Sequence, residues 1–409
     1  MYMSSNGKES KRIYLDYAAT TPVDARVAKA MKRYESQDFG NPSSIHEEGV
    51  VAKKAMESAR KKVAALFSAH GDEIVFTSGG TESNNLAILG FLQALLASGR
   101  PLHKCHAITS VIEHSSVLEC FRELEKKGVV VDYAPVTDKG IVDLKAFKKL
   151  LRPTTALVSI QYANNEIGTI QPIRDIAKLI RHYKKNTDDR TQTSDKKIQG
   201  SRKIIFHTDA SQAVQYLTMN TQMLGVDMAT IDGHKMYGPK GVGALYVRRG
   251  VLLQPILFGG RQEGGLRSTT ENVSAIVGLA EACEISATVR DAETKRLSVL
   301  RDYFFEQITH AVPNASINGD RDARLPNNIN ISILNLDAEY AVLQFDVAGI
   351  ACSTKSSCLT HDSLSYVIFA LDSNRERAET SLRFTLGRST TKKEIDATVL
   401  MLKKIVGKW

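Results

Sequence analysis

Long hydrophobic runs are absent from this chain of 409 residues, and none reaches the ~18 apolar residues that a membrane-spanning helix needs. The N-terminal stretch MYMSSNGKESKR also lacks the apolar core of a secretory signal peptide. Cysteine is scarce, since only five occur and no two form a CxxC pair, which argues against a disulfide framework and a zinc site. Together these absences predict a cytoplasmic protein without a membrane anchor.

An even charge balance is also missing, because the formal net charge is +9. Much of the surplus lies between residues 181 and 203, where eight Lys or Arg side chains stand against three Asp. This stretch is poor in apolar residues, so we interpret residues 186–203 as an exposed basic insertion loop. An RNA contact is the alternative, but charge runs are usually solvated, and direct nucleic-acid binding is not expected.

A regular alternation of short apolar runs and amphipathic helical segments extends from about residue 70 to 250. This alternation predicts an α/β fold in which helices cover both faces of a mostly parallel, seven-stranded sheet. Ligands are then expected beyond the carboxyl ends of the strands. The expected strands are 73–77, 107–110, 129–133, 156–160, 203–208, 226–231 and 244–247.

The chain is too long for a single hydrophobic core, so two domains are expected. A long helical stretch at 273–312 and a strand at 328–334 follow the alternating region. We therefore predict a large domain over residues 26–262 and a smaller α/β domain over residues 263–409. The N-terminal segment 1–25 is expected to pack with the small domain.

Lys235 stands in the most distinctive segment of the chain, DMATIDGHKMYGPKGVG at 227–243. A short apolar run ends at Asp232, Gly233 and His234 just before it, and a glycine- and proline-rich stretch follows. A lysine that leaves a strand for such non-helical backbone has the mobility and partial desolvation that a nucleophilic lysine needs. A surface lysine in a glycine-rich turn is the alternative, so the neighbouring strand ends must decide.

Two of these strand ends carry groups suited to a charged ligand. Gly79, Gly80 and Thr81 form a turn before a helix, where backbone N–H groups bind phosphate without a positive side chain; a simple helix cap is the alternative. Asp209 follows another strand, and a buried carboxylate there needs a partner. A protonated pyridine nitrogen, a core salt bridge and a metal are the candidates for that partner.

A metal is the candidate that we favour least. His and Asp two apart on a strand point to the same side in many proteins without binding a metal, so no metal is expected here. The group that would have to hold one consists of His207, Asp209, Asp232 and His234.

Polar residues also follow two further strands. His114, in VIEHS, is suited to stacking on a ring or to moving a proton, although a lone histidine is more often simply hydrogen-bonded. Asn164 and Asn165, in YANNEIG, offer amides to a phenolic oxygen or shape a turn. A phosphate-binding turn, a carboxylate, a histidine, two amides and a lysine at one edge of a sheet together suit pyridoxal 5'-phosphate.

Nine strings occur in a set order along almost the whole chain: YLDYAATTPVD at 14–24, FGNPSS at 39–44, IVFTSGGTESNNLAI at 74–88, EH at 113–114, NNEIG at 164–168, HTDASQAV at 207–214, DGHKMYGPKGVGALYVRR at 232–249, LRSTTENV at 266–273 and SLRFTLGR at 381–388. In this order they resemble the cysteine desulfurases of the class V aminotransferase group. The resemblance implies the type I pyridoxal phosphate-dependent transferase fold. It also implies an enzyme that takes sulfur from L-cysteine, leaves L-alanine and holds the sulfur as a persulfide.

The resemblance, taken motif by motif, assigns a pyridoxal phosphate site. Lys235 would bond covalently to the cofactor, His114 would stack on its ring and move protons, and Asp209 would keep the ring nitrogen protonated. Gln212 and Asn165 would approach the phenolic oxygen. The phosphate would be held by Gly80, Thr81, His234 and, in a homodimer, the partner subunit's Thr270.

The same comparison assigns residues to the substrate and to the sulfur. Arg383 would clamp the carboxylate of L-cysteine bidentately, with Asn41 nearby. Cys358 would carry the persulfide, because GIACSTKSSC at 349–358 resembles the family's GIAVSTGSAC, whose last cysteine has that role. Its polar neighbours predict a mobile loop with an accessible thiolate. Cys352 stands where the family often has valine, and it is expected to be a small buried hydrophobe.

Three residues depart from the family's strings. Asp232 replaces a serine or threonine beside the phosphate, where a carboxylate repels a dianion, so either its side chain turns away or the cofactor binds less tightly. Thr269 and Lys355 replace glycines, which leaves the local loop geometry open.

The departures leave alternatives to a desulfurase. One is another class V pyridoxal phosphate enzyme, such as a selenocysteine lyase or a carbon–sulfur lyase that releases sulfide. Another is a non-catalytic dimeric scaffold that binds a sulfur-transfer partner or RNA. The sulfur acceptor is expected to be a protein of iron–sulfur cluster assembly or of tRNA thiolation.

Overall fold

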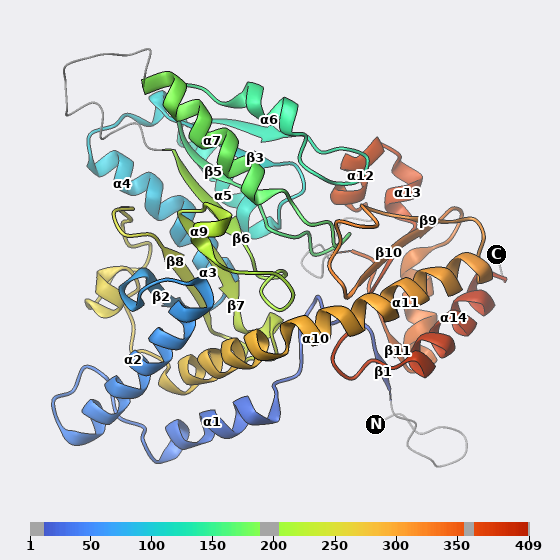
Figure 1. Ribbon diagram of the computed structural model, residues 1–409, viewed down its shortest axis with the longest axis horizontal. Helices are drawn as coiled ribbons and strands as arrows, with labels where there is room; N and C mark the ends of the chain where they lie inside the picture. Colours follow the sequence, from blue (N-terminus) through green and yellow to red (C-terminus); the bar gives the residue numbers. More distant parts are fainter. Residues whose placement is uncertain (1–11, 189–203, 356–363, 408–409) are drawn as a thin grey trace.

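The computed structural model describes residues 12–188, 204–355 and 364–407, and it has a larger and a smaller lobe (Figure 1). A seven-stranded sheet forms the centre of the larger lobe, with the strand order β2-β8-β7-β6-β5-β3-β4. β8 pairs antiparallel with β2 and β7, whereas the pairs from β7 to β4 are all parallel. The strands are β2 Ile74–Thr77, β3 His106–Ser110, β4 Val130–Ala134, β5 Thr155–Ser159, β6 Ile205–Asp209, β7 Met228–Asp232 and β8 Gly243–Val247.

Helices cover both faces of this sheet, because successive side chains of a strand point to opposite faces and both sets are apolar. Ala107 and Leu157 pack with α4 and α5 on one face. Their neighbours Ile108 and Val158 pack with α2, α7 and α10 on the other. The helices of the larger lobe are α1 Ala25–Ser36, α2 Glu47–Phe67, α3 Gly80–Asn85, α4 Phe91–Ala97, α5 Ser115–Lys126, α6 Leu144–Leu150, α7 Ile173–Asp188 and α9 Thr221–Leu224, with the short turns η1 Gly71–Glu73, η2 Leu86–Gly90, η3 Leu102–Lys104, η4 Gly233–Lys235 and η5 Gln262–Gly265.

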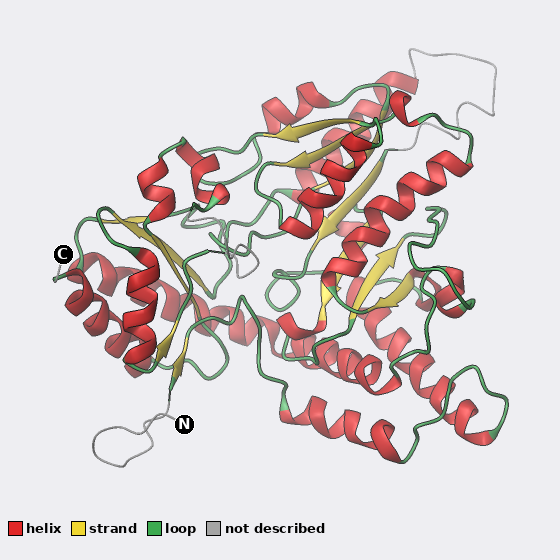
Figure 2. Cartoon of the chain, turned by 180° about the vertical axis from the view of Figure 1, so that it is seen from behind, coloured by secondary structure: helices red, strands yellow, loops and turns green. Residues whose placement is uncertain are grey.

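The smaller lobe contains a three-stranded antiparallel sheet of order β12-β10-β9, which Figure 2 shows from behind with its helices packed beside it. Buried Ile329 and Ile331 of the central strand belong to the main core, together with Phe384 of the edge strand. The elements of this lobe are α10 Val273–Ala311, β9 Ala315–Ile317, β10 Asn328–Ile333, α11 Ala338–Val347, β11 Ile350–Ala351, α12 Tyr366–Asp372, α13 Arg375–Glu379, β12 Ser381–Thr385 and α14 Lys392–Val406.

The N-terminal segment joins the two lobes. β1 Ile13–Tyr14 pairs in parallel with β11 of the small lobe, and the Leu15 N–H donates to Ala351 O at 2.8 Å. A few residues further on, the Thr21 N–H donates to His234 O of the large lobe at 2.9 Å. The segment therefore starts beside the small lobe, as the division at residue 25 proposes, and then crosses to the large one.

Helix α10 also belongs to both lobes by contact. It packs against α1 and α2 at the large lobe and against α14 and β10 at the small one, and in Figure 1 it passes above α1 from one lobe to the other. The division that we propose at residues 262 and 263 therefore precedes a helix that both lobes share.

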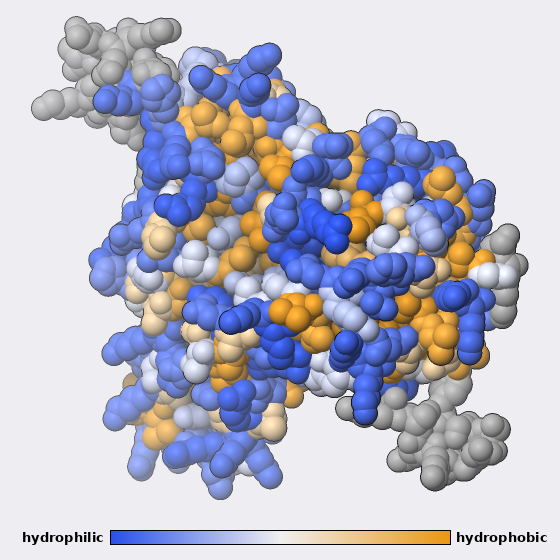
Figure 3. Space-filling view, turned by 45° about the vertical axis from the view of Figure 1, so that its right-hand side comes forward, coloured by the Kyte–Doolittle hydropathy of each residue, from blue (hydrophilic) through white to orange (hydrophobic). Residues whose placement is uncertain are grey.

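The predicted secondary structure is confirmed in most particulars. Each of the seven expected apolar runs corresponds to one of the strands β2 to β8, and the helical stretch at 273–312 is α10. The predicted insertion loop at 186–203 lies almost wholly outside the described residues. Within the part of the chain that is described, no helix is long and apolar enough to span a bilayer. On the face seen in Figure 3, hydrophobic residues form separate patches among hydrophilic ones.

Candidate active site

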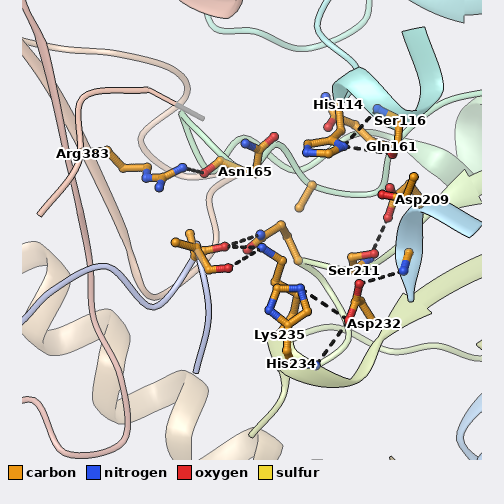
Figure 4. Close-up of a pocket in the computed structure, with 16 residues that line it drawn as sticks. His114, Ser116, Gln161, Asn165, Asp209, Ser211, Asp232, His234, Lys235 and Arg383 are labelled. Carbon is orange, nitrogen blue, oxygen red and sulfur yellow. Dashed lines mark hydrogen bonds and ion pairs between the residues drawn. The ribbon is translucent and has the colours of Figure 1, made fainter. Parts of the chain in front are cut away.

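A cavity of about 200 Å³ lies at the carboxyl ends of the parallel strands (Figure 4). Its wall comes from the loops after β3, β5, β6 and β7, from the start of α3, from the N-terminal segment and from β12 of the small lobe. The sheet topology explains this meeting, because parallel strands deliver their following loops to one edge. The predicted site residues that line the cavity are Gly80, Thr81, His114, Asn165, Asp209, Gln212, Asp232, His234, Lys235 and Arg383.

Lys235 reaches the cavity from the turn η4, directly after β7. Its Nζ donates to Ala18 O at 2.7 Å and to Ala19 O at 2.8 Å, so the ammonium is held against the N-terminal segment. Tyr237, two residues later, has a φ of 62°, and its N–H donates to the Thr21 hydroxyl at 2.7 Å. This half-buried lysine itself ends a single 3-10 turn, and the predicted non-helical backbone begins directly after it.

Asp209, at the end of β6, is connected to His114 through two further side chains. The Asn84 amide donates to Asp209 Oδ2 at 2.7 Å and to the Ser116 hydroxyl at 2.8 Å. The Ser116 hydroxyl lies 2.9 Å from His114 Nδ1. Ser211 N–H donates to the other Asp209 oxygen at 2.9 Å. Hydrogen bonds thus orient the carboxylate toward the cavity.

His114 is the N-cap of α5, where Nδ1 accepts the Ser116 N–H at 3.2 Å. Because Nδ1 is an acceptor, the neutral ring carries its proton on Nε2. The preceding Glu113 is completely buried and accepts the Gln161 N–H with both carboxylate oxygens, at 2.9 and 3.0 Å. Burial raises the pKa of Glu113 to about 8, against the opposing effect of these hydrogen bonds and of one from Ser110.

The two asparagines of the loop after β5 have different positions. Asn164 is completely buried, and its Oδ1 accepts the Glu166 N–H at 2.8 Å, so it shapes the turn. Asn165 lines the cavity instead. Gln212 also lines it and donates to Ala18 O at 3.0 Å. Of the two amides that the sequence offered in this loop, only Asn165 borders the cavity.

Asp232 faces the start of α3. Its Oδ2 accepts the Gly80 N–H at 2.7 Å, and its Oδ1 lies 3.5 Å from His234 Nε2. Burial acts to raise the pKa of Asp232, but the hydrogen bond and charge of His234 and the Gly80 N–H outweigh it, so the pKa lies below its ordinary value. The side chain therefore does not turn away from the predicted phosphate turn.

Arg383 enters from β12 and is only 1% exposed. One guanidinium nitrogen donates to Asp16 Oδ1 at 2.9 Å and the other to Asn165 O at 3.0 Å. Its Nε is buried and has no hydrogen-bond partner among the described residues. In Figure 4 the guanidinium lies across the cavity from His114 and Asp209, so the two lobes present a cation and an anion to one space.

Asn41 does not line this cavity within a single copy of the chain, so its role beside the substrate stays a prediction. Asn41 is exposed and lies in the loop between α1 and α2, where its Oδ1 accepts the Ser43 N–H at 2.9 Å. The following Pro42 and Ser43 border a different cavity, together with Arg261. Within one copy, Asn41 and Arg383 therefore belong to different surroundings.

Two other predicted residues remain untested by this geometry. Thr270 is exposed, follows η5 and does not line the cavity, so its role in binding phosphate stays a prediction that requires a second subunit. Cys358 lies outside the described residues. Cys352 is described, and it packs partly buried against the main core, close to its predicted role as a small hydrophobe.

The two residues that replace glycines fit ordinary backbone. Neither Thr269 nor Lys355 has a positive φ, so neither position requires the conformational freedom of glycine. Lys355 is 8% exposed, with its Nζ 3.5 Å from Glu339 Oε1. The loop geometry is therefore compatible with both substitutions.

Sequence reasoning missed three residues that organise the cavity: Asn84, Ser116 and Asp16. A signal existed for Asn84, because it stands one helical turn after Gly80 and so points to the same side of the helix. Ser116 lies two residues after His114, where a polar residue commonly closes a helix cap. Asp16 carried no local signal, since its partner Arg383 is 367 positions away.

Comparisons with known proteins agree with this geometry. The family model described as aminotransferase class-V matches residues 13–188 and 190–398. The protein named cysteine desulfurase IscS from Dictyoglomus turgidum is 44% identical over 400 residues, which is 97% of this chain and 95% of that protein. Cysteine desulfurase IscS 1 from Archaeoglobus fulgidus is 41% identical over 394 residues, 96% of each.

A solved structure of a protein named NifS-like protein has a TM-score of 0.87 and 34% sequence identity to this chain. The match covers 97% of this chain and 100% of the other. The likeness thus extends over both lobes and the cavity between them. The chain belongs to the aminotransferase class-V family and, within it, to the cysteine desulfurases.

Proposed function

We propose that this enzyme takes sulfur from L-cysteine, releases L-alanine and keeps the sulfur as a persulfide on Cys358. The observation that carries the proposal is the convergence of Lys235, Asp209, His114 and Arg383 on one cavity from both lobes. Overall, the Cys358 thiol and L-cysteine give the Cys358 persulfide and L-alanine. Atoms and electrons balance in this transfer, so no external oxidant or reductant is required.

The residues of the cavity fit pyridoxal 5'-phosphate. The turn before α3 offers backbone N–H groups for a phosphate, and Asp209 offers an oriented carboxylate for a protonated ring nitrogen. Lys235 offers the amine for a covalent bond, with His234, Asn165 and Gln212 as further polar neighbours that line the cavity. When bound, the cofactor takes up the electron pair released at the substrate's alpha carbon.

Arg383 would bind the carboxylate of L-cysteine. A guanidinium pairs bidentately with a carboxylate, and the buried Nε of Arg383 still has a free donor site in the described structure. The substrate would share Arg383 with Asp16 or displace that carboxylate from it. His114 would move protons at its Nε2, since its Nδ1 is engaged by the Ser116 N–H.

The segment that leads to Cys358 begins beside Arg383. Ser353 pairs with Arg383 through two backbone hydrogen bonds, of 2.6 and 3.1 Å, and the described chain continues to Lys355. In the proposed step the Cys358 thiolate attacks the substrate sulfur. The new sulfur–sulfur bond forms as the carbon–sulfur bond breaks, its electron pair stays on the carbon, and a proton added to that carbon completes alanine.

A homodimer is part of this proposal. Thr270 does not line the cavity of its own subunit, and the adjacent Glu271 borders a second, larger cavity of about 980 Å³. Two loops that border this second cavity expose large apolar side chains, which favours a covered surface. These side chains are Phe39, Ile45, Leu257 and Phe258. A second copy seated there would bring the partner's Thr270 toward a phosphate site.

The destination of the sulfur also belongs to the proposal. Iron–sulfur cluster assembly, tRNA thiolation or both would consume the persulfide through an acceptor protein. The basic stretch at 186–203 lies almost wholly outside the described residues, so no acceptor is assigned to it. The cytoplasm stays the predicted compartment, on the scarcity and spacing of the cysteines.

The test combines a spectrum with two product assays. Purified protein supplied with pyridoxal phosphate is expected to show the visible absorption band of a lysine-bound cofactor, and Lys235→Ala is expected to lose that band. On addition of L-cysteine, alanine and protein-bound persulfide should form in equal amounts in the first turnover. The Cys358→Ala variant should keep the band and lose the persulfide.

Cys352→Ala is the matched control, because Cys352 precedes Cys358 by six positions and packs against the core. This variant should keep the persulfide. Sulfide release with pyruvate and ammonia in place of alanine, undiminished in Cys358→Ala, would instead identify a carbon–sulfur lyase. A wild-type protein that takes up no cofactor would identify a non-catalytic scaffold.

A further inference from the structure

The turn before α3 already holds an anion that belongs to the chain. Asp232 Oδ2 accepts the Gly80 N–H at 2.7 Å, and Asp232 Oδ1 accepts the His234 N–H at 3.3 Å (Figure 4). A Cβ placed on Gly79 or Gly80 would lie 3.1 or 3.2 Å from Oδ2, so the carboxylate packs directly on the glycine turn. The backbone donor proposed for the cofactor phosphate is therefore already used by a carboxylate.

The position of Asp232 leaves a phosphate beside the carboxylate rather than in its place. Two cavities, of about 200 and about 330 Å³, meet at the start of α3, and both are lined by Asp232. The residue is only 9% exposed, which limits the directions in which its side chain can swing. A phosphate that reaches the turn through either cavity would lie in contact with this carboxylate.

Charged groups from several neighbouring elements line the two cavities around Asp232. Glu82 of α3 is neutralised by Arg267 at 2.9 Å, and Asp209 of β6 is bonded to Asn84 rather than to Asp232. The remaining groups are Lys235, His114 and Arg383 in the first cavity, Lys240 in the second and His234 in both. If Lys235 bonds covalently to the cofactor, His234 and Lys240 face both the carboxylate and the phosphate.

We propose that Asp232 makes this site bind the cofactor phosphate as its monoanion, with one proton shared between the carboxylate and a phosphate oxygen. The inference rests on the proposed function, because it assumes pyridoxal phosphate in this cavity. Two anionic oxygens at contact distance repel each other, whereas a proton between them turns the contact into a hydrogen bond, as in carboxyl pairs that share one proton. Asp232 is thus a positioning residue for the phosphate and sets the pH range of cofactor retention.

Proton uptake gives the proposal a signature. A free phosphate monoester loses its second proton near a pKa of about 6, so above neutral pH the cofactor must take up a proton from solvent when it binds. Linkage then weakens the affinity for the cofactor by up to about tenfold per pH unit. A site with a neutral side chain at position 232 binds the dianion without this uptake.

The experiment compares two probes on the same proteins. Dissociation constants of pyridoxal 5'-phosphate and of pyridoxal, which lacks the phosphate, are measured by the absorption band at several values between about pH 6.5 and 8.5, above the phosphate pKa. The ratio of the two constants cancels the pH dependence of the lysine bond itself. In the wild type, the dissociation constant of pyridoxal phosphate divided by that of pyridoxal should increase as pH rises, by up to about tenfold per pH unit.

Asp232→Ser and the isosteric Asp232→Asn should flatten that dependence. At the highest pH each variant should bind pyridoxal phosphate about tenfold or more tightly than the wild type, and pyridoxal equally well. Glu82→Gln is the matched control, because Glu82 is an acid on the same helix turn that Arg267 already pairs, and its ratio should follow the wild type. Equal slopes in the wild type and in both Asp232 variants would overturn the proposal.

Phosphorus NMR of the wild-type protein loaded with pyridoxal phosphate measures the charge of the bound phosphate directly. This test needs no variant, so it holds even if the Asp232 variants fail to fold. A monoanionic phosphate signal at pH 8 supports the proposal, and a dianionic one overturns it. Failure of the proposed function has a different outcome, because then neither pyridoxal nor its phosphate produces the lysine-bound band in any of these proteins. That result would contradict the proposed function and, with it, the inference about Asp232.

Discussion

At the scale of single residues, Asp16 is the counter-ion of Arg383, the residue that we propose for the substrate carboxylate. Arg383 is almost fully buried, and Asp16 neutralises it in the structure at 2.9 Å. A buried guanidinium without a counter-ion is unfavourable, so Asp16 keeps the cation in place before substrate arrives. In the proposed function, the substrate carboxylate would then meet a donor that is pre-oriented but already charge-balanced.

Arg383→Lys is expected to raise KM for L-cysteine about ten- to hundredfold, with a smaller change in kcat, because lysine keeps the charge but loses the two-pronged geometry. Steady-state alanine formation measures both constants. Arg388→Lys is the matched control, since Arg388 pairs with Asp24 at 3.0 Å and does not line the cavity. An unchanged KM in Arg383→Lys would assign the substrate carboxylate to another group.

At the scale of elements, the N-terminal segment and the turn η4 act as one unit. The Thr21 hydroxyl donates to His234 O at 2.9 Å and accepts the Tyr237 N–H at 2.7 Å. The carbonyls of Ala18 and Ala19 accept from Lys235. Since β1 pairs with β11 of the small lobe, this segment connects the lysine turn mechanically to the small lobe.

Thr21→Val is expected to lower the free energy of unfolding by about 1–3 kcal/mol, because an isosteric apolar side chain leaves the buried Tyr237 N–H without its acceptor, although His234 O keeps the Thr21 N–H. Urea denaturation followed by circular dichroism measures this change. Thr218→Val, at an exposed threonine, should stay within about 0.5 kcal/mol of the wild type. If the two variants lose equal stability, the hydroxyl of Thr21 does not hold the turn.

At the scale of the whole molecule, the central sheet contains a buried polar layer as well as its apolar faces. His207 of β6 is completely buried, with Nδ1 2.8 Å from the Ser159 hydroxyl of β5 and Nε2 3.1 Å from the Thr230 hydroxyl of β7. Burial lowers the pKa of His207 to about 4. The ring is therefore neutral at physiological pH and joins three strands.

The contribution of His207 to the unfolding free energy is accordingly expected to fall as pH decreases from about 6.5 to 4, whereas buried Glu113, whose pKa is raised to about 8, contributes the opposite slope down to about pH 4.5 and is common to the wild type and His207→Gln. In this window the unfolded chain protonates His207, whose ordinary pKa is about 6.5, while the folded chain does not, so the slope reaches about 1.4 kcal/mol per pH unit. Urea midpoints at pH 7, 6 and 5 measure it. His207→Gln should show a shallower decline between about pH 6.5 and 5.

The unfolding free energy of His207→Gln should still depend on pH in this window, because burial also lowers the pKa of a second histidine, His106. Carboxylates with lowered pKa values, such as Asp24 at about 2, act mainly below this window. An identical slope in His207→Gln and the wild type would mean that His207 becomes protonated in the folded state.

Local sequence patterns were enough to predict the strands of the large sheet and most of the residues that reach the cavity. The strands of the central sheet follow from apolar runs whose side chains are buried on both faces, as Ile108 and Ala107 illustrate. Lys235, Asp209 and His114 were found because each directly follows a strand, and the parallel topology gathers such positions at one edge. These inferences succeeded because they rest on local patterns.

Only the tertiary structure decided which groups pair across the cavity. The Asp232 carboxylate binds the Gly80 N–H over a separation of 152 positions, and Arg383 meets Asp16 over 367. Nothing in the sequence indicated that the loop of Asn41 borders a different cavity from Arg383 within one copy of the chain. Local spacing predicts which residues reach an edge, but hydrogen bonds and ion pairs depend on distances of a few ångströms that the packing of two lobes sets.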